Sequence, residues 1–369
     1  MVAPETGSFA GKDLTMFVLS IAAVSASLTL AAPTTIDPDI VETRIVDLTQ
    51  TVTLNDIPAG TKQVRLWVPI PSDRSWQRVL SREVVSAPGT GAVERQSEGR
   101  GEFVYVTIDR PTETTATVVV KCTVEREGVH FPLENASLGG TIQPVMFEES
   151  LEVNAPLMEA NAKIKAIADQ VCGSETDVAK QAQLLMAAVA DKADHYSKDP
   201  SKPKCGRGSA EDCLVQGGGC CTDLHSLFIA LARARGIPAR LQYGYRMLDA
   251  KAGAEYDPGY RCWIEFFVPG TGWVPTDIVA ADGVDAAHPQ KWDSLSATRV
   301  WLWEGRSFEL TPVNKSGPVD TMICGWAEID GKPVDVLPAK DGSPSKLGRK
   351  VKFEVVKTDR KPDDPKLPE

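Results

Sequence analysis

Residues 42 to about 132 contain short runs rich in valine, isoleucine and threonine, separated by turns built from proline and glycine. The runs are Thr43–Thr53, Gln63–Val68, Phe103–Ile108 and Ala116–Glu125. Several short strands without a helical period are typical of an antiparallel sandwich. We therefore predict a β-sandwich domain over residues 37–132, followed by a linker at residues 133–153, and expect this domain to act as a scaffold.

The period of the hydrophobic positions becomes helical after the linker. A first helix is indicated by apolar residues from Leu157 to Val171, and a second by those between Asp177 and Ala193, with Ser174 or Thr176 as its cap. Residues 199–219 are predicted as a loop. A third helix, Cys221–Arg235, carries a wide apolar stripe that suits the centre of a core.

Strands are predicted again after the third helix. They are Ala239–Tyr245, Arg261–Val268 and Gly272–Thr276, with a further β region at about residues 298–336. Helices followed by antiparallel strands predict an α+β fold, with a second domain at residues 154–340. Residues 341–369 are expected to form a C-terminal extension that ends in a charged, proline-rich, disordered tail.

The N-terminal segment resembles a secretory signal. Lys12 precedes an apolar stretch, Met16–Leu30, and small residues follow it. We expect residues 1–32 to be a cleaved signal peptide, with an uncut membrane anchor as the alternative, because the stretch is shorter than the roughly 20 residues of a usual span. The protein is then exported and is periplasmic, exposed on the cell surface or secreted.

Composition narrows the classes of partner. Apolar residues make up 42% of the chain and the net charge is −10, which describes a globular, acidic protein. Binding to nucleic acid or to an anionic membrane needs clustered positive charge, so neither is expected. The eight cysteines and four scattered histidines show no zinc-finger spacing, so we expect no metal and no cofactor. Cys205 and Cys213 flank a short loop and could pair there.

The candidate chemistry lies where the glycine-rich loop becomes the third helix. Cys221 follows Gly219 and Cys220 at the first helical position. The helix dipole and the unpaired backbone N–H groups there favour a thiolate, which predicts a pKa for Cys221 below the usual 8.5 or so. The glycines allow a substrate to approach the backbone closely, so Gly219 and Cys220 are predicted to contact it.

Four blocks of sequence resemble the core of the transglutaminase-like superfamily. They are the helix start around Cys221 and Asp223, the Gly236–Arg240 turn, the Cys262–Phe266 strand and the Gly272–Asp277 hairpin. The resemblance extends over about residues 42–336. It implies a papain-like core, with the nucleophile helix packed on an antiparallel sheet.

The resemblance also implies roles for individual residues. Cys221 matches the nucleophile, and Asp277 matches the acid that orients the catalytic imidazole. Trp263 and Glu265 match strand residues that line and support the site. For Asp223 we prefer a capping role at the helix start.

One position departs from the family pattern, because Arg261 stands where the catalytic histidine is expected. Arginine stays charged and cannot accept a proton, although it can favour a thiolate and pair with Asp277. His225, one turn after Cys221 on the same helix, is the best substitute base. His195 is a weaker substitute, since it precedes a long loop that could reach the cleft.

Two main functions therefore stay open. One is a cysteine acyltransferase, amidase or peptidase that acts through a thioester at Cys221 on a protein or peptide outside the cytoplasm. The other is a catalytically degenerate relative that binds peptides or serves as a scaffold, because Arg261 replaces the histidine. A purely structural surface module and a redox role for Cys220 or Cys221 are less favoured alternatives.

Overall fold

The structure is a computed structural model that describes residues 36–95, 100–133, 141–204, 207–259, 261–282, 291–322, 325–336 and 345–360. These residues belong to one compact unit, Pro33–Glu369. The expected signal or anchor at residues 1–32 lies outside them, as do Cys205 and the chain beyond Arg360. No helix in the described ranges has both the length and the apolar character needed to cross a membrane.

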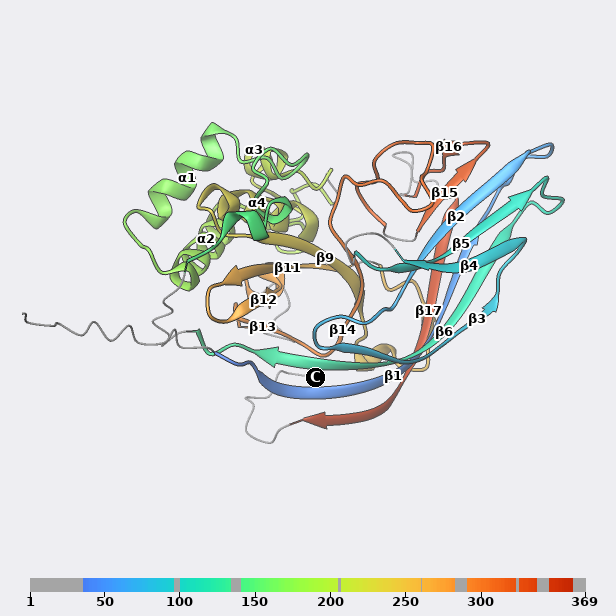
Figure 1. The fold of residues 1–369 in the computed structure, drawn as a ribbon, viewed down its shortest axis with the longest axis horizontal. Coiled ribbons are helices and arrows are strands. Elements are labelled where there is room, and N and C mark those ends of the chain that lie inside the picture. The colour runs from blue at the N-terminus through green and yellow to red at the C-terminus, as the bar shows by residue number, and fades with distance from the viewer. Residues whose placement is uncertain are drawn as a thin grey trace, which may run out of the picture. The chain divides into compact units, whose positions relative to one another are not determined.

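The longest strands form a twisted sheet at the base of Figure 1, in the order β10-β17-β1-β6-β13, with β3 also paired to β6. Its members are β1 (Asp39–Leu54), β3 (Gln77–Ser86), β6 (Ala116–His130), β10 (Glu255–Tyr256), β13 (Ser294–Leu295) and β17 (Leu347–Arg360). In β1 every second residue from Val46 to Leu54 is buried, which is the pattern of a sheet with one face on the core.

A second sheet has the order β16-β15-β2-β5-β4. Its strands are β2 (Gln63–Ile70), β4 (Thr90–Arg95), β5 (Glu102–Asp109), β15 (Trp326–Ile329) and β16 (Lys332–Pro333). The four predicted N-terminal strands are confirmed as β1, β2, β5 and β6. Strand pairing crosses the domain boundaries expected from sequence, because β15 pairs with β2 and β17 pairs with β1.

A third, four-stranded sheet carries the helices. Its order is β12-β11-β9-β14, formed by β9 (Ala239–Arg246), β11 (Arg261–Val268), β12 (Gly272–Thr276) and β14 (Arg299–Glu304). The helices are α1 (Ala162–Cys172), α2 (Val178–Lys192), α3 (Ala210–Gln216), α4 (Cys221–Ala234) and the short α5 (Ile278–Ala281). Helix α4 packs on β11 and β9, and α1, α2 and α3 surround it (Figure 1).

Helix α4 is the centre of this part of the core. All its residues from Cys221 to Arg233 are buried, and the rings of Phe228 and Phe266 are 6.1 Å apart across the α4–β11 contact. The combination of helices with antiparallel sheets confirms the α+β class in outline. Two local predictions were wrong: Asp177 caps α2, because its side chain accepts the Lys180 N–H at 3.0 Å, and α3 lies within the predicted loop.

Candidate active site

Helix α4 begins at Cys221, and its N-cap Cys220 separates it from the two-residue strand β8 (Gly218–Gly219). Asp223 closes this helix start, because its Oδ2 accepts the Cys220 N–H at 2.9 Å. The predicted capping role of Asp223 is thereby confirmed. Gly219 leaves room for this carboxylate, since a Cβ at Gly219 would lie 2.6 Å from Asp223 Oδ2. A side chain at position 219 would therefore collide with the carboxylate that caps the helix.

The Asp223→Ala variant is expected to lower the free energy of unfolding by about 1–2 kcal/mol, because the helix start loses its cap. Asp223→Asn is the matched control, since its side-chain oxygen can still accept the Cys220 N–H. Urea unfolding of both variants measures the difference. Equal losses in the two variants would show that the hydrogen bond is not what stabilises the helix start.

The residue of β11 that lies beside Cys221 is Cys262. The thiol of Cys221 is hydrogen-bonded to the thiols of Cys262 and Cys220. Cys262 Sγ also lies 3.2 Å from His225 Nδ1 and 3.5 Å from Thr222 Oγ1. Three thiols and an imidazole therefore converge at the first turn of α4, two of the thiols coming from the helix start and the third from the facing strand.

Arg261 and Trp263 belong to the opposite face of β11 from Cys262, because side chains alternate along a strand. Arg261 is exposed at the first position of β11, and the ring of Trp263 packs over Gly244 of β9. Position 261, where the family pattern expects a histidine, is therefore not the β11 position that meets Cys221 here. Cys262 occupies that place.

Glu265 lies with Trp263 on the face of the sheet that is turned away from α4. It is buried and pairs with Arg240 Nη2 at 2.6 Å and Arg74 Nη2 at 3.2 Å. The two guanidinium groups outweigh burial and hold the pKa of Glu265 below its usual value. The structure thus places Trp263 and Glu265 in a layer that supports the sheet, and it does not bring them to Cys221 as the family comparison led us to expect.

His225 is completely buried behind Cys262. Its Nε2 accepts the backbone N–H of Ile278 at 3.1 Å, so in the neutral ring the proton is on Nδ1 and faces Cys262. Asp277 Oδ1 lies 3.6 Å from the same Nε2, and protonation of Nε2 would exchange the Ile278 contact for this carboxylate. The predicted substitute base is therefore at the site, and its direct partner is Cys262.

Asp277 holds the far side of the imidazole. Its Oδ1 accepts the Ala280 N–H at 3.2 Å and caps α5, while its Oδ2 pairs with Arg299 Nη2. Burial alone would raise the pKa of Asp277, but Arg299 and His225 outweigh it and hold the pKa below the usual range. Asp277 therefore stays ionised, with its Oδ1 3.6 Å from His225 Nε2.

The thiolate of the cluster belongs to Cys262. Burial opposes a charge on Cys262, yet the hydrogen bond from Cys221 and the interactions with His225 and Thr222 lower the pKa of Cys262 to about 6. Hydrogen bonding to Cys220 and Cys262, together with burial, raises the pKa of Cys221 well above its usual value. The predicted low pKa for Cys221 is thus wrong, because two neighbouring thiols compete with the helix dipole. The two cysteines titrate as a pair.

Comparison with known proteins relates the part of the chain around this site to a known family. Residues 165–278, from α1 to the start of α5, match the sequence model of the transglutaminase-like superfamily. This chain carries a transglutaminase-like domain. An uncharacterised protein of Haemophilus influenzae is 26% identical over 364 residues, which cover 88% of this chain and 96% of the relative.

A solved structure shares the fold of this chain. A candidate cysteine protease from Cytophaga hutchinsonii superposes with a TM-score of 0.57 at 16% identity, covering 90% of this chain and 96% of its own. The periplasmic domain of TgpA from Pseudomonas aeruginosa, at a TM-score of 0.32 and 16% identity, covers 62% of this chain and 91% of its own. The first likeness concerns the fold, and the second is too low to support a conclusion.

His195 is the other histidine close to the transglutaminase-like site. It lies in β7 (Asp194–His195), which pairs with β8 so that His195 is opposite Gly219. Its Nδ1 accepts the Ser197 N–H at 3.2 Å. Burial lowers the pKa of His195, so the ring is neutral at pH 7, and its titration also responds to Cys220 and Arg261. His195 was the weaker of the two substitute bases predicted from the sequence, and β7 brings it next to the helix start.

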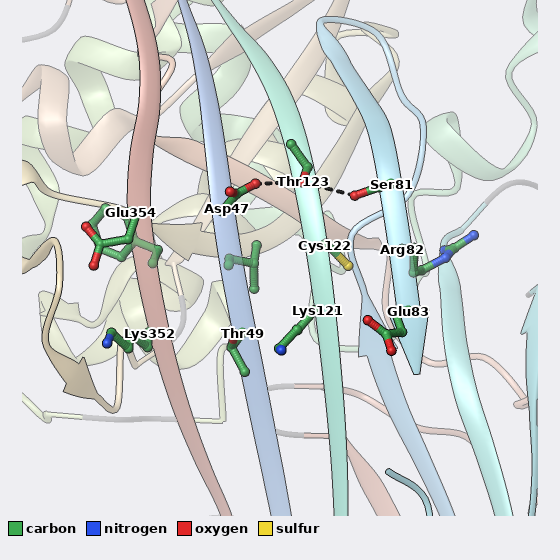
Figure 2. A pocket seen from close by; sticks show the side chains of 12 residues that line it. Asp47, Thr49, Ser81, Arg82, Glu83, Lys121, Cys122, Thr123, Lys352 and Glu354 are labelled. Atoms are coloured by element: carbon green, nitrogen blue, oxygen red, sulfur yellow. Dashed lines mark hydrogen bonds between the residues drawn. The ribbon is translucent and has the colours of Figure 1, made fainter. Parts of the chain in front are cut away.

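A trough of about 530 Å³ lies away from this site, on the sheet formed by β17, β1, β6 and β3 (Figure 2). Acidic and basic side chains alternate along it, including Asp47, Lys121 and Glu83. This mixture of charges is usual for a solvated sheet face. Within the described ranges, no group of three or more histidine, cysteine or acidic side chains has the arrangement of a metal site.

Proposed function

We propose that the protein is a cysteine-dependent acyltransferase or amide-cleaving hydrolase that works through a thioester at Cys221. The convergence of Cys221, Cys262 and His225 at the start of α4 is the observation that supports this most directly. A substrate reaches Cys221 first, because Cys221 is 8% exposed whereas Cys262 and His225 are completely buried. Cys262 and His225 therefore act from behind the nucleophile.

The chemistry follows from the positions of the protons. As Cys221 Sγ attacks a carboxamide or peptide carbonyl, its proton passes to the Cys262 thiolate, with which it is already hydrogen-bonded. Backbone N–H groups at the helix start stabilise the oxyanion. The tetrahedral intermediate collapses to a thioester, and the leaving amine takes the proton back from Cys262. Water or an amine then resolves the thioester and regenerates the Cys221 thiol.

His225 and Asp277 support this transfer without touching the substrate. The Nδ1–H of His225 stabilises the negative charge whenever it is on Cys262, and the Ile278 N–H holds the ring at Nε2. The Asp277 carboxylate, 3.6 Å from Nε2, raises the pKa of His225. A thiolate held by a buried imidazole thus takes the place of the direct cysteine–histidine contact expected from the family pattern. The arrangement supplies a proton acceptor even though position 261 is arginine.

The substrate and location are part of the proposal. We propose a protein or peptide substrate outside the cytoplasm, in keeping with the signal-like residues 1–32, and an exported protein that is periplasmic, exposed on the cell surface or secreted. The N-terminal β-sandwich predicted from sequence would serve as the support on which the transglutaminase-like domain is mounted.

The test is a screen of short amide and glutamine-containing peptides with hydroxylamine as acyl acceptor, read out as hydroxamate formation. Cys221→Ala is expected to reduce turnover by about a thousand-fold or more, because the covalent route is lost. Cys172→Ala, which removes a buried thiol in α1, is the control and should retain turnover. Turnover that survives in Cys221→Ala would overturn the proposal.

A degenerate, peptide-binding role is the second candidate, and Arg261 is the observation that favours it. Its exposed guanidinium at the start of β11 suits a carboxylate-bearing peptide. Under this alternative, peptides with a free C-terminal carboxylate would bind equally well to the wild type and to Cys221→Ala, and binding would weaken in Arg261→Ala. Under the acyltransferase proposal, hydroxamate forms and depends on Cys221.

A further inference from the structure

The active-site cluster contains more thiols than acyl transfer uses. A single cysteine forms a thioester, yet Cys220, Cys221 and Cys262 all meet at the start of α4. The thiols of Cys221 and Cys262 come from elements far apart in the sequence and are hydrogen-bonded face to face. This geometry brings the two sulfur atoms together without any intervening group.

We propose that Cys221 and Cys262 form a redox-active dithiol that exchanges with the disulfides of small thiols and closes to an intramolecular disulfide. Cys221 is the entry point because it keeps some exposure, and the completely buried Cys262 is the resolving thiol. This activity goes beyond acyl transfer and does not require it.

The reaction proceeds in two balanced steps. Cys221, as thiolate after passing its proton to Cys262, attacks a small disulfide, which gives a mixed disulfide and releases one small thiolate. Cys262 then attacks the Cys221 sulfur, the Cys221–Cys262 bond forms, and the second small thiolate leaves. In total, the Cys221 thiol and the Cys262 thiolate are oxidised to one disulfide, and the small disulfide is reduced to two small thiolates. The single cysteine proton leaves Cys262 as it attacks and protonates one of these thiolates, and the solvent protonates the other.

The imidazole favours the second step. His225 Nδ1 lies 3.2 Å from Cys262 Sγ and stabilises its thiolate, which is the form that attacks the mixed disulfide. Thr222 Oγ1, 3.5 Å away, contributes a further polar contact. The resolving cysteine is thus the one whose charge the site already stabilises.

Cys220 is a poorer partner for Cys221 although their thiols are also hydrogen-bonded. Adjacent Cα atoms are about 3.8 Å apart, which is shorter than the roughly 4.4–6.8 Å span of ordinary disulfides. Cys220 is also fixed in an extended conformation as the cap of α4, with its N–H bonded to Asp223. A bond between neighbours would have to distort this cap, whereas Cys262 approaches from the facing strand.

The closed disulfide would block acyl transfer, because both the nucleophile and its proton acceptor are consumed. Reduction by the same small thiols restores them. The redox state of the surroundings would then decide which of the two chemistries the site can perform.

The test uses the full chain incubated with glutathione disulfide, alkylated, and digested with trypsin without reduction. A Cys221–Cys262 bond joins two tryptic peptides, Gly208–Arg233 and Cys262–Lys291, whereas a Cys220–Cys221 bond stays within the first. We expect to find these two peptides linked, with two fewer free thiols in the protein, and we expect reduced glutathione to reverse the link.

Three variants serve as controls. The linked peptides should still form in Cys220→Ser and in Cys213→Ser. In Cys262→Ser the reaction should stop at the glutathione adduct on Cys221.

Two results would overturn the dithiol: a wild-type protein that retains the glutathione adduct without joining the peptides, or a joined pair that survives in Cys221→Ser. Because the readout is mass, it is independent of turnover. Hydroxamate formation by the fully reduced protein tests the acyl proposal separately, so either proposal can fail while the other stands.

Discussion

Asp277→Ala is expected to lower the free energy of unfolding by about 3–5 kcal/mol, because it leaves a buried arginine without its counter-charge. Arg299 is 2% exposed, and its Nε and Nη1 have no hydrogen-bond partner among the described residues, so Nη2 and Asp277 provide the ion pair. The variant also removes the cap of α5 from the Ala280 N–H. Urea or thermal unfolding measures the loss.

Two further variants separate charge from shape. Asp277→Asn keeps the cap and should lower the free energy of unfolding by less than the alanine variant does. Asp277→Ala combined with Arg299→Leu should regain much of the lost stability, since no unpaired charge remains.

The stabilisation by Asp277 should depend on pH. Because the pKa of Asp277 is held below its usual value in the folded protein, the stability advantage of the wild type over Asp277→Asn should be fully present above about pH 4. It should shrink as the pH falls through the folded pKa. A loss below about 1 kcal/mol in Asp277→Ala would contradict the account.

The second large effect concerns reactivity. Cys262→Ala is expected to speed the alkylation of Cys221 at pH 7, by about tenfold for each unit by which its pKa falls, because the hydrogen bond and the charge of Cys262 raise the pKa of Cys221 in the wild type. In the wild type, the thiolate of the pair is on Cys262, whose pKa is lowered to about 6, and Cys221 keeps its proton. The pH at which labelling of Cys221 is half-maximal should therefore move downward in the variant, toward the value of a free thiol, about 8.5.

The control for this experiment is Cys122→Ala, which removes a buried thiol from β6, far along the sequence from the cluster. Its labelling profile should match the wild type. His225→Asn should fall between wild type and Cys262→Ala, since the pair keeps its shared proton but loses the imidazole. Labelling of Cys221 that is no faster in Cys262→Ala than in the wild type would show that Cys262 does not raise the pKa of Cys221.

Much of the core followed from the sequence because strong local patterns produced it. The apolar stripe of α4 and its start at Cys221 were predicted from spacing, and the strand Arg261–Val268 was predicted with both ends correct. Asp223 and Asp277 were singled out through the resemblance to the transglutaminase-like pattern, which has an acid at the start of the nucleophile helix and another after the hairpin. Strands β3 and β4 were missed. Most of β3 is exposed, so it lacks the alternation that marks a half-buried strand.

The site was predicted less well, because its chemistry depends on which face of β11 meets α4. Alternation correctly separates Cys262 from Arg261, but the sequence does not say which of the two faces the helix. The Phe228–Phe266 contact decides it, since Phe266 shares a face with Cys262. Strand β14 places Arg299 beside Asp277, and β7 places His195 opposite Gly219. No sequence motif near either residue points to the site. The sequence did offer a reason to consider Cys262 a site residue, since it lies within the Cys262–Phe266 strand, one of the blocks that carry the resemblance to the transglutaminase-like superfamily.

The most direct test of the account is the pH dependence of alkylation of the reduced wild-type protein, with each labelled cysteine identified by mass spectrometry. The account predicts that the thiolate of the pair is on Cys262, so that labelling at Cys221 rises only above the pKa of a free thiol, about 8.5. Labelling at Cys221 that rises with an apparent pKa near 6 would place the thiolate on Cys221, and would contradict the thiolate pair and the proton transfer to Cys262 in the proposed acyl transfer.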